Sequence, residues 1–337
     1  MKTAKFWHKT DKGCVQCELC PHGCCVAEGN TGICKVRGVE NGELIAMGYG
    51  IVSSAHVDPI EKKPLYHFYP GKEIFSIGGW GCNLGCSFCQ NWTISQQFIP
   101  ESERRTPDEM VSAAANAGSI GIAYTYNEPL IGIEFVQDCA ALAKAQGLVN
   151  VLVSNGYIMP APAAELLPLI DAANVDIKSM DDNFYLKQCK GRLDPVLDFC
   201  KQAIAAGTHI EITNLIIPTL NDEMKLLETL AKWMADNLGK GVPLHLSAYH
   251  PQYKLKIPAT EHGALEKAYE ICRKHLLYVY VGNVWTSKGQ DTQCPDCGEI
   301  IISRQGYATD VCGMNDDVCV KCGRKIEGVF VSKGVKT

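Results

Sequence analysis

Three cysteines within one short stretch constrain this chain more than any other feature. Cys82, Cys86 and Cys89 have the spacing C-x3-C-x2-C, and Phe88 precedes the last of them. Three thiolates can hold three irons of a 4Fe–4S cube, which leaves the fourth iron for a ligand that is not protein. A structural zinc knuckle is the alternative, but zinc takes four ligands in a closed tetrahedron and no obvious fourth ligand stands nearby. The spacing therefore predicts a cluster with one open iron.

Composition and charge exclude several classes of protein. The chain has 337 residues, 46% of them hydrophobic, which suffices for one large barrel-type domain with small satellites. Its net charge of -5 argues against a nucleic-acid surface, which draws on clustered lysine and arginine. Residues 1–10 lack the apolar core of a signal peptide, and no apolar run reaches the length of a membrane span. We therefore expect a cytoplasmic protein that has no membrane partner and whose main function is not nucleic-acid binding.

Most of the eighteen cysteines fall into groups, which in a reducing compartment indicates metal sites rather than disulfides. The amino-terminal group contains the spacing C-x2-C-x3-C-x9-C. Its four members are Cys17, Cys20, Cys24 and Cys34. Zinc and a second iron–sulfur cluster both accept four thiolates, and the sequence does not choose between them. Reduced, unligated thiols are the remaining alternative, and Cys14 and Cys25 are surplus to a four-ligand site.

A second quartet lies near the end of the chain. Two C-x2-C knuckles, each followed by glycine, are separated by twenty-one residues. Their cysteines are Cys294, Cys297, Cys319 and Cys322. Paired knuckles indicate one tetrahedral site for zinc, or for iron because they also resemble those of rubredoxin. Cys312 is expected to be a bystander, and the cysteines that occur singly are expected to be small buried side chains: Cys139, Cys189, Cys200 and Cys272.

Between residues 71 and 286, short apolar runs alternate with amphipathic helices, as is typical of a parallel sheet with helical crossovers. The predicted strands span residues 74–78, 120–125, 149–153, 174–178, 210–217, 244–248 and 277–281. We therefore predict an α/β fold, a partial (β/α)6 TIM-type barrel at 71–286. A Cys-rich metal-binding piece at 1–70 precedes it, and a zinc-ribbon or rubredoxin-like piece at 287–337 follows. The capping box Thr106-Pro-Asp-Glu109 predicts a helix start.

Chemistry in such barrels lies at the carboxyl ends of the strands, and polar residues follow or close the predicted strands. The cysteine stretch follows the first strand, and the fifth strand bears Glu211, Thr213 and Asn214. We expect the polar groups to meet at one mouth. Cys82, Cys86 and Cys89 are expected to be the only thiols there.

The cysteine stretch closely resembles the signature of the radical S-adenosylmethionine (SAM) enzymes. The resemblance implies that the open iron binds the amino and carboxylate groups of SAM. It also implies reductive cleavage of SAM to methionine and a 5'-deoxyadenosyl radical, which abstracts a hydrogen atom from a substrate.

The barrel segment is similar to the glycyl-radical activating enzymes, such as pyruvate formate-lyase activating enzyme. The matching stretches are Tyr126-Asn127-Glu128-Pro129, Asn155-Gly156, Asp176-Ile-Lys178 and Tyr249-His250. In that family a Gly-Gly-Glu-Pro stretch binds the SAM amine, so only Glu128-Pro129 carries over cleanly. The family's counterparts of Asp176 and Lys178 serve a monovalent cation and SAM respectively.

The polar groups at the strand ends and the resemblance together give the expected cofactor-binding set, in which Ser154 and Asn155 suit the ribose of SAM: Phe88, Asn127, Glu128, Ser154, Asn155, Asp176, Lys178, Asn214, His250 and Asn283. Glu128 or Asn127 would accept from the SAM amine, and Lys178 would pair with its carboxylate. An apolar setting makes a lysine costly unless an anion meets it, although a salt bridge to Asp176 or a snorkelling side chain would also serve. His250 could contact SAM, donate a proton or only close a turn.

Nearly the whole chain is similar to the AmmeMemoRadiSam-system radical SAM enzymes. The match includes residues 17–24, 58–71, the cluster stretch through Trp92, Tyr280-Val-Gly-Asn283 and the terminal knuckles. It implies association with Memo-type and AMMECR-type proteins, and leaves the substrate, a protein or a small molecule, unidentified. We also expect an electron donor such as ferredoxin or flavodoxin. A non-catalytic metal-binding adaptor is the alternative, but an adaptor has no use for polar groups at seven strand ends.

Overall fold

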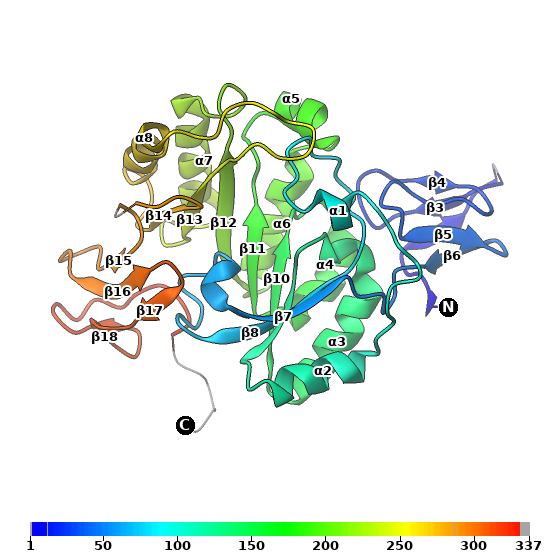
Figure 1. The fold of residues 1–337 in the computed structure, drawn as a ribbon, viewed down its shortest axis with the longest axis horizontal. Coiled ribbons are helices and arrows are strands. Elements are labelled where there is room, and N and C mark those ends of the chain that lie inside the picture. Colours follow the sequence, from blue (N-terminus) through cyan, green and yellow to red (C-terminus); the bar gives the residue numbers. More distant parts are fainter. Residues whose placement is uncertain (1, 12, 287, 331–337) are drawn as a thin grey trace.

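The centre of the molecule is an eight-stranded sheet (Figure 1). The structure is a computed structural model that describes residues 2–11, 13–286 and 288–330. The strands lie in the order β14-β13-β12-β11-β10-β9-β8-β7, and all neighbours from β8 to β14 are parallel. Their bounds are β7 Ser54–Pro59, β8 Glu73–Gly78, β9 Gly121–Tyr124, β10 Val149–Ser154, β11 Ala172–Asp176, β12 His209–Ile216, β13 Leu244–Ala248 and β14 Val279–Gly282. These overlap the seven predicted strands, so the α/β fold with a parallel sheet is confirmed and is consistent with a partial barrel.

Helices lie in the connections between the strands of this sheet. The longer ones are α2 (Pro107–Asn116), α3 (Ile133–Ala145), α4 (Pro160–Leu166), α6 (Asp194–Ala205), α7 (Met224–Asn237) and α8 (His262–Cys272). The shorter ones are η1 (Ile60–Lys62), α1 (Trp92–Ser95), η2 (Pro129–Gly132), η3 (Leu167–Leu169), α5 (Asp182–Phe184) and η4 (Tyr185–Cys189), a π-helix. The predicted capping box is present, because the Thr106 side chain accepts from the Glu109 amide and the Glu109 carboxylate accepts from the Thr106 amide.

The edge strand β7 was missing from the sequence prediction. It pairs antiparallel with β8 from Ser54 to Pro59, so the sheet begins before residue 71. Three of its six residues are exposed and it ends in proline, as is common at a sheet edge. Such a strand lacks the apolar run that marked the parallel strands.

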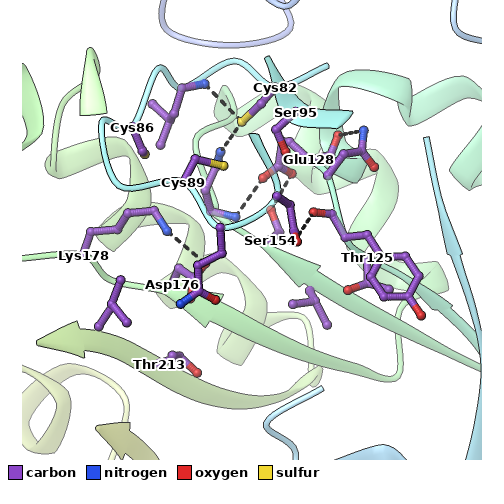
Figure 2. A pocket seen from close by; sticks show the side chains of 18 of the residues that line it. Cys82, Cys86, Cys89, Ser95, Thr125, Glu128, Ser154, Asp176, Lys178 and Thr213 are labelled. Carbon is purple, nitrogen blue, oxygen red and sulfur yellow. Dashed lines mark hydrogen bonds and ion pairs between the residues drawn. The ribbon is translucent and has the colours of Figure 1, made fainter. Parts of the chain in front are cut away.

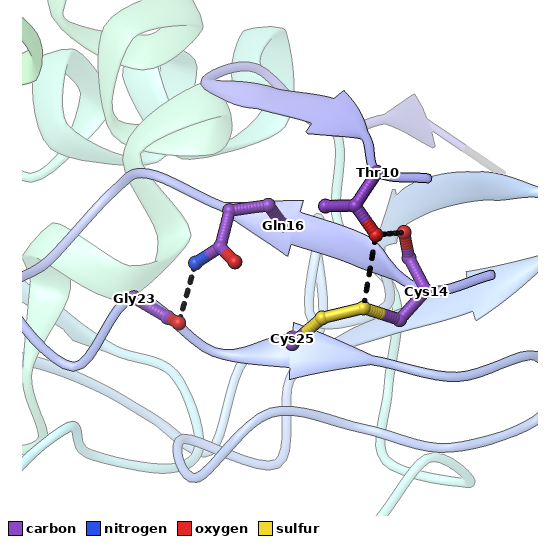
Figure 3. Close-up of a disulfide and its surroundings, with 5 residues drawn as sticks. All are labelled: Thr10, Cys14, Gln16, Gly23 and Cys25. Atoms are coloured by element: carbon purple, nitrogen blue, oxygen red, sulfur yellow. Dashed lines mark hydrogen bonds between the residues drawn. A yellow bond between two sulfur atoms is a disulfide. The ribbon is translucent and has the colours of Figure 1, made fainter. Parts of the chain in front are cut away.

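The amino-terminal piece consists of two small sheets beside α3 and α4 (Figure 1). The first contains β2 (Trp7–Lys9), β3 (Val15–Cys17) and β4 (Cys25–Val26). The second contains β1 (Lys2–Thr3), β6 (Glu43–Ala46) and β5 (Arg37–Glu40). Cys14 and Cys25 form a disulfide across the first sheet (Figure 3), with Cα atoms 5.6 Å apart. The sequence analysis left these two cysteines unassigned, and their pairing keeps both thiols out of the neighbouring quartet.

The carboxyl-terminal piece lies on the opposite side of the barrel from the amino-terminal piece (Figure 1). It contains β15 (Thr292–Gln293), β16 (Ile300–Gln305), β17 (Ala308–Asp310), β18 (Met314–Asn315) and β19 (Val318–Cys319). Arg304 donates to the carbonyl of Tyr66 over 2.8 Å and stacks on its ring, which fixes this piece to the barrel. Residues 287 and 331–337 of the predicted terminal domain lie outside the described residues. None of the helices in the described part of the chain has the length and apolar character of a membrane span.

Glu211 lies away from the predicted mouth, near the amino end of β12. Its buried carboxylate accepts from His245 over 2.6 Å and from the backbone amides of Tyr66 and His67 over 3.0 and 2.7 Å. The prediction that the polar residues of the fifth strand all point to one mouth is therefore wrong for this side chain. Glu211 instead ties the segment before β8 to the base of the sheet.

Candidate active site

A cavity of about 590 Å³ opens at the carboxyl ends of the parallel strands (Figure 2). The loop after β8 contributes Cys82, Cys86 and Cys89 to its wall, and the end of β11 contributes Asp176. The volume lies within the range typical of sites for cofactors and small molecules. The structure thus brings the three cysteines to the mouth where the sequence predicted them.

The backbone before the first cysteine is held by Asn127. Its Oδ1 accepts from the Gly79 amide over 2.9 Å, and its Nδ2 donates to the carbonyls of Trp80 and Gly81 over 3.0 and 3.1 Å. Both the oxygen and the nitrogen of the Asn127 side-chain amide are therefore bonded to the cysteine loop. Asn127 lines the cavity, but its polar atoms position the cysteine loop.

Glu128 is the buried acid of the cavity. Ser154 Oγ donates to it over 2.7 Å, the Asn155 amide over 2.8 Å and the Leu130 amide over 3.0 Å. Burial outweighs these donors and raises the pKa of Glu128 to about 7. The three donors hold the carboxylate of Glu128 in one orientation. Because its pKa lies near neutrality, a ligand that donates hydrogen bonds to this carboxylate would stabilise its charged form.

Asn155 links Glu128 to the cysteine loop. Its backbone amide donates to Glu128, while its Nδ2 donates to Asn83 Oδ1 over 3.0 Å and to Cys82 Sγ over 3.6 Å. A hydrogen bond to a ligand sulfur is one of the means by which proteins tune an iron–sulfur cluster. One side chain therefore couples the acid to the first thiol.

Lys178 and Asp176 form a salt bridge of 2.9 Å at the end of β11 (Figure 2). Burial disfavours the charged lysine, but the negative charges of Asp176, Cys86 and Cys189 together outweigh it and raise the pKa of Lys178. Both residues line the cavity. Of the two partners that the sequence allows for Lys178, Asp176 and an anionic ligand, the structure shows Asp176.

Residues 77–230 match the family model of the Radical SAM superfamily. An uncharacterized protein of Methanocaldococcus jannaschii, MJ0808, is 43% identical over 337 residues, covering 98% of this chain and 100% of that protein. The chain thus contains a radical SAM domain over residues 77–230. The pyruvate formate-lyase-activating enzyme of Clostridium pasteurianum is 28% identical over 50% of this chain and 72% of its own. A radical SAM methyltransferase structure from Sphaerobacter thermophilus has a TM-score of 0.51 at 16% identity, covering 64% of this chain and 67% of that chain, which supports the fold alone.

The radical SAM superfamily implies a 4Fe–4S cluster and SAM, and the cavity suits both. In the described chain, the sulfurs of the three cavity cysteines are not gathered within 4.8 Å of one another, as the ligands of a single ion would be. Cys82, Cys86 and Cys89 could hold the cluster. Glu128 offers an acceptor and Lys178 a cation beside it, which matches the amine and the carboxylate of SAM.

Tyr126 occupies the position of a glycine in the Gly-Gly-Glu-Pro stretch of the activating enzymes. Its φ of +69° lies in the left-handed region that glycine adopts without cost. Its carbonyl accepts from Asn91 over 2.7 Å, and its hydroxyl donates to Asp58. These two bonds, one to the main chain and one from the side chain, hold Tyr126 in a conformation that a non-glycine residue adopts only at a cost.

Three of the predicted cofactor contacts lie outside the cavity lining of this radical SAM site. Asn214 is buried and donates to the Ile177 carbonyl over 2.7 Å. His250 is exposed, with Nε2 3.1 Å from the carbonyl oxygen of Asn283, and Asn283 donates to the Ala248 carbonyl over 2.7 Å. Phe88 does line the cavity, packed under the cysteine loop.

A fourth thiol, that of Cys189, is buried behind the cysteine loop and does not line the cavity. Cys189, at the end of η4, donates a hydrogen bond to Cys86 and thereby lowers the pKa of Cys86. The Cys189 carbonyl also accepts from the Gly85 amide over 2.8 Å. Among the described residues that line the cavity, the motif cysteines are the only thiols, as expected. Cys189 does not belong to any cysteine motif in the sequence, so its position could not be predicted. The packing of η4 against the cysteine loop places it next to Cys86.

The segment after β7 supplies lining residues that the sequence analysis did not assign. Lys62, Lys63 and Pro64 border the cavity, and both lysines donate to Asp58 over 2.7 Å. The signal available was a dense run of charges and prolines, Asp58 to Pro64, just before a buried strand. Without the antiparallel β7, that run could not be placed at the mouth.

The two cysteine quartets both assemble, in different ways. Cys294 and Cys322 have sulfurs 3.5 Å apart, and those of Cys297 and Cys319 are 3.8 Å apart. All four sulfurs lie within 4.8 Å of one another, so this quartet could hold a metal ion. The exposed Cys312 lies outside it, as predicted. The amino-terminal quartet lines a separate small cavity: Cys17, Cys20, Cys24 and Cys34.

Proposed function

We propose that the protein is a radical SAM enzyme that abstracts a hydrogen atom from a substrate, in a reaction of the glycyl-radical-activating type. The observation that carries this proposal is that the C-x3-C-x2-C thiols share one cavity with the buried acid Glu128. The bound cluster and SAM would supply one-electron cleavage to methionine and a 5'-deoxyadenosyl radical. The chain itself binds, orients and shields these groups.

Each cavity residue has a task in this proposal. Cys82, Cys86 and Cys89 bind the cluster and leave one iron free. Glu128 accepts hydrogen bonds from the SAM amino group, since its own donors hold it in place. Lys178 attracts the SAM carboxylate and exchanges its bond to Asp176 for the ligand, which leaves Asp176 available to a monovalent cation.

The type of reaction is inferred from relatives that are activating enzymes. They include the pyruvate formate-lyase-activating enzyme of Clostridium pasteurianum and a putative glycyl-radical enzyme activating enzyme of Methanocaldococcus jannaschii, at 28% and 25% identity. A protein glycine is therefore the first substrate class to test. The further predictions from sequence are an electron donor such as ferredoxin or flavodoxin, association with Memo-type and AMMECR-type proteins, and zinc or iron at the carboxyl-terminal quartet.

A non-catalytic metal-binding adaptor is the weaker proposal. An adaptor would give no reason for a buried acid, a partly buried lysine and an open cavity beside three thiols. Placing these groups in the interior costs free energy that a scaffold need not spend.

The test is formation of 5'-deoxyadenosine. The protein is reconstituted without oxygen and supplied with SAM and dithionite. We expect 5'-deoxyadenosine from the wild type and a loss of at least about a hundredfold in a variant with Cys82, Cys86 and Cys89 changed to Ala, because radical formation requires the cluster. Cys312→Ser is the matched control and should keep the wild-type rate. Equal product from wild type and triple variant would refute the proposal.

A further inference from the structure

The amino-terminal cysteine quartet forms a cavity of its own. Cys17 ends β3, Cys20 and Cys24 lie in the turn before β4, and Cys34 lies in the loop before β5. The turn is closed by the Cys17 amide, which donates to the Cys24 carbonyl over 2.9 Å. Four thiols thus converge from three segments on one small space.

The sulfurs are too widely spaced for one metal ion. A tetrahedral ion with Zn–S bonds of about 2.3 Å places its sulfurs roughly 3.8 Å apart. The carboxyl-terminal quartet meets that condition, with pairs at 3.5 and 3.8 Å. Within the described chain, no three of the amino-terminal sulfurs lie within 4.8 Å of one another, although all four line one cavity. The barrel trio, which suits a cube of four irons, shares this wider spacing.

A buried cation with a free donor lines the same cavity. Arg37 is 2% exposed, and its Nη1 pairs with Glu134 at 2.9 Å. Its Nη2 donates to the Lys5 carbonyl, but its Nε has no hydrogen-bond partner among the described residues. A buried N–H without a partner costs free energy. An anionic cluster offers sulfur acceptors at this place, and such hydrogen bonds are a known means of tuning cluster potential.

We propose that Cys17, Cys20, Cys24 and Cys34 hold a second 4Fe–4S cluster, fully ligated by protein, rather than zinc. The sequence leaves that choice open, whereas the sulfur spacing and the unpartnered Arg37 Nε both favour a multi-iron anion.

The second cluster lies beside the radical SAM site. His22, between two of its ligands, has Nε2 2.6 Å from the carbonyl oxygen of Asn83, the residue after Cys82. Gly81 adopts a φ of +80°, and a Cβ there would collide with the Cys34 carbonyl. The loop that precedes the first radical SAM cysteine is therefore packed directly against the backbone of a quartet ligand.

The test is iron and acid-labile sulfide analysis, with zinc analysis and electron paramagnetic resonance, on full-length protein purified without oxygen. The wild type should contain about eight irons and eight sulfides per chain. The variant Cys82→Ala, Cys86→Ala, Cys89→Ala should keep about four of each and a 4Fe–4S spectrum. Sulfide separates cluster iron from any single iron in the carboxyl-terminal quartet.

The reciprocal variant, Cys20→Ser with Cys34→Ser, should lose about four irons and keep its zinc content and the radical SAM cluster. A triple variant that retains no sulfide, or a reciprocal variant that loses zinc, would overturn the proposal. The triple variant leaves the amino-terminal piece intact, so it decides the question even where the reciprocal variant misfolds. Failure of the enzymatic proposal is distinct, since SAM cleavage would then be absent while both clusters remain.

Discussion

The two cysteine quartets offer the same four thiolates but differ in how far apart they hold them. In the carboxyl-terminal quartet, two short knuckles face each other, and Gly298 and Gly323 donate back to the carbonyls of Cys294 and Cys319 over 2.9 Å each. In the amino-terminal quartet, the thiols come from a strand end, a turn and a separate loop. The comparison indicates that backbone geometry, rather than ligand type, selects between one ion and a cluster.

The surroundings of the two quartets also differ. The amino-terminal cavity contains the buried Arg37 and is in contact with the radical SAM loop. The carboxyl-terminal quartet lies on the far side of the barrel, and its Cys322 is exposed. A cluster needs tuning and protection, whereas a structural ion needs only closed ligation.

The largest expected effect comes from breaking the compact quartet. Cys319→Ser with Cys322→Ser should release one metal ion and unfold the carboxyl-terminal piece, because structural zinc binding supplies folding free energy on the order of 10 kcal/mol. Metal analysis and limited proteolysis measure the two effects. Sulfide content should not change; if it falls, the two quartets are not independent.

The next effect concerns the buried ion pair between Arg37 and Glu134, which has no counterpart beside the carboxyl-terminal quartet among the described residues. Arg37→Met leaves Glu134, whose side chain is 1% exposed, without its cation. We expect a loss of about 3–5 kcal/mol in unfolding free energy, measured by denaturant titration. The double variant Arg37→Met, Glu134→Leu should recover much of the loss. An undiminished stability in the single variant would contradict the role assigned to this pair.

A smaller effect concerns SAM binding. SAM should bind only at the cluster of Cys82, Cys86 and Cys89, which leaves one iron free, and at neither of the two quartets, where protein supplies all four ligands. Glu128 must be ionised to accept fully from the SAM amino group, and burial raises its pKa to about 7. SAM affinity should therefore fall as pH drops through 7, by roughly tenfold between pH 8 and pH 6. Equilibrium dialysis with the cluster-loaded protein measures it. Glu128→Gln should bind more weakly with a flatter pH profile, and an equally steep profile would assign the titration to another group.

The smallest effect is expected at Cys312, the thiol that belongs to neither quartet. Its sulfur donates to the Ile300 carbonyl over 3.6 Å on the exposed edge of the terminal piece. Cys312→Ser should change the unfolding free energy by less than about 0.5 kcal/mol and leave metal content unchanged. Loss of zinc in this variant would contradict the assignment, because Cys312 would then be a metal ligand.

Periodicity predicted the parallel strands and motif spacing predicted the cysteine groups, because both depend on local pattern. The remaining features depend on tertiary packing. Whether a polar side chain faces the mouth is set by its level along the strand, so Asp176 lines the cavity while Glu211 lies at the base. The π-helix η4 places Cys189 next to Cys86. No cysteine spacing in the sequence predicts this proximity.

Native mass spectrometry of the intact, anaerobically purified protein tests most directly the claim that sulfur spacing sets the number of metals at each site. We expect a mass excess equal to two 4Fe–4S clusters and one single ion, with one cluster missing when Cys82, Cys86 and Cys89 are Ala. A mass excess equal to one cluster and two single ions would contradict it, because the amino-terminal quartet would then hold an ion that its spacing does not fit.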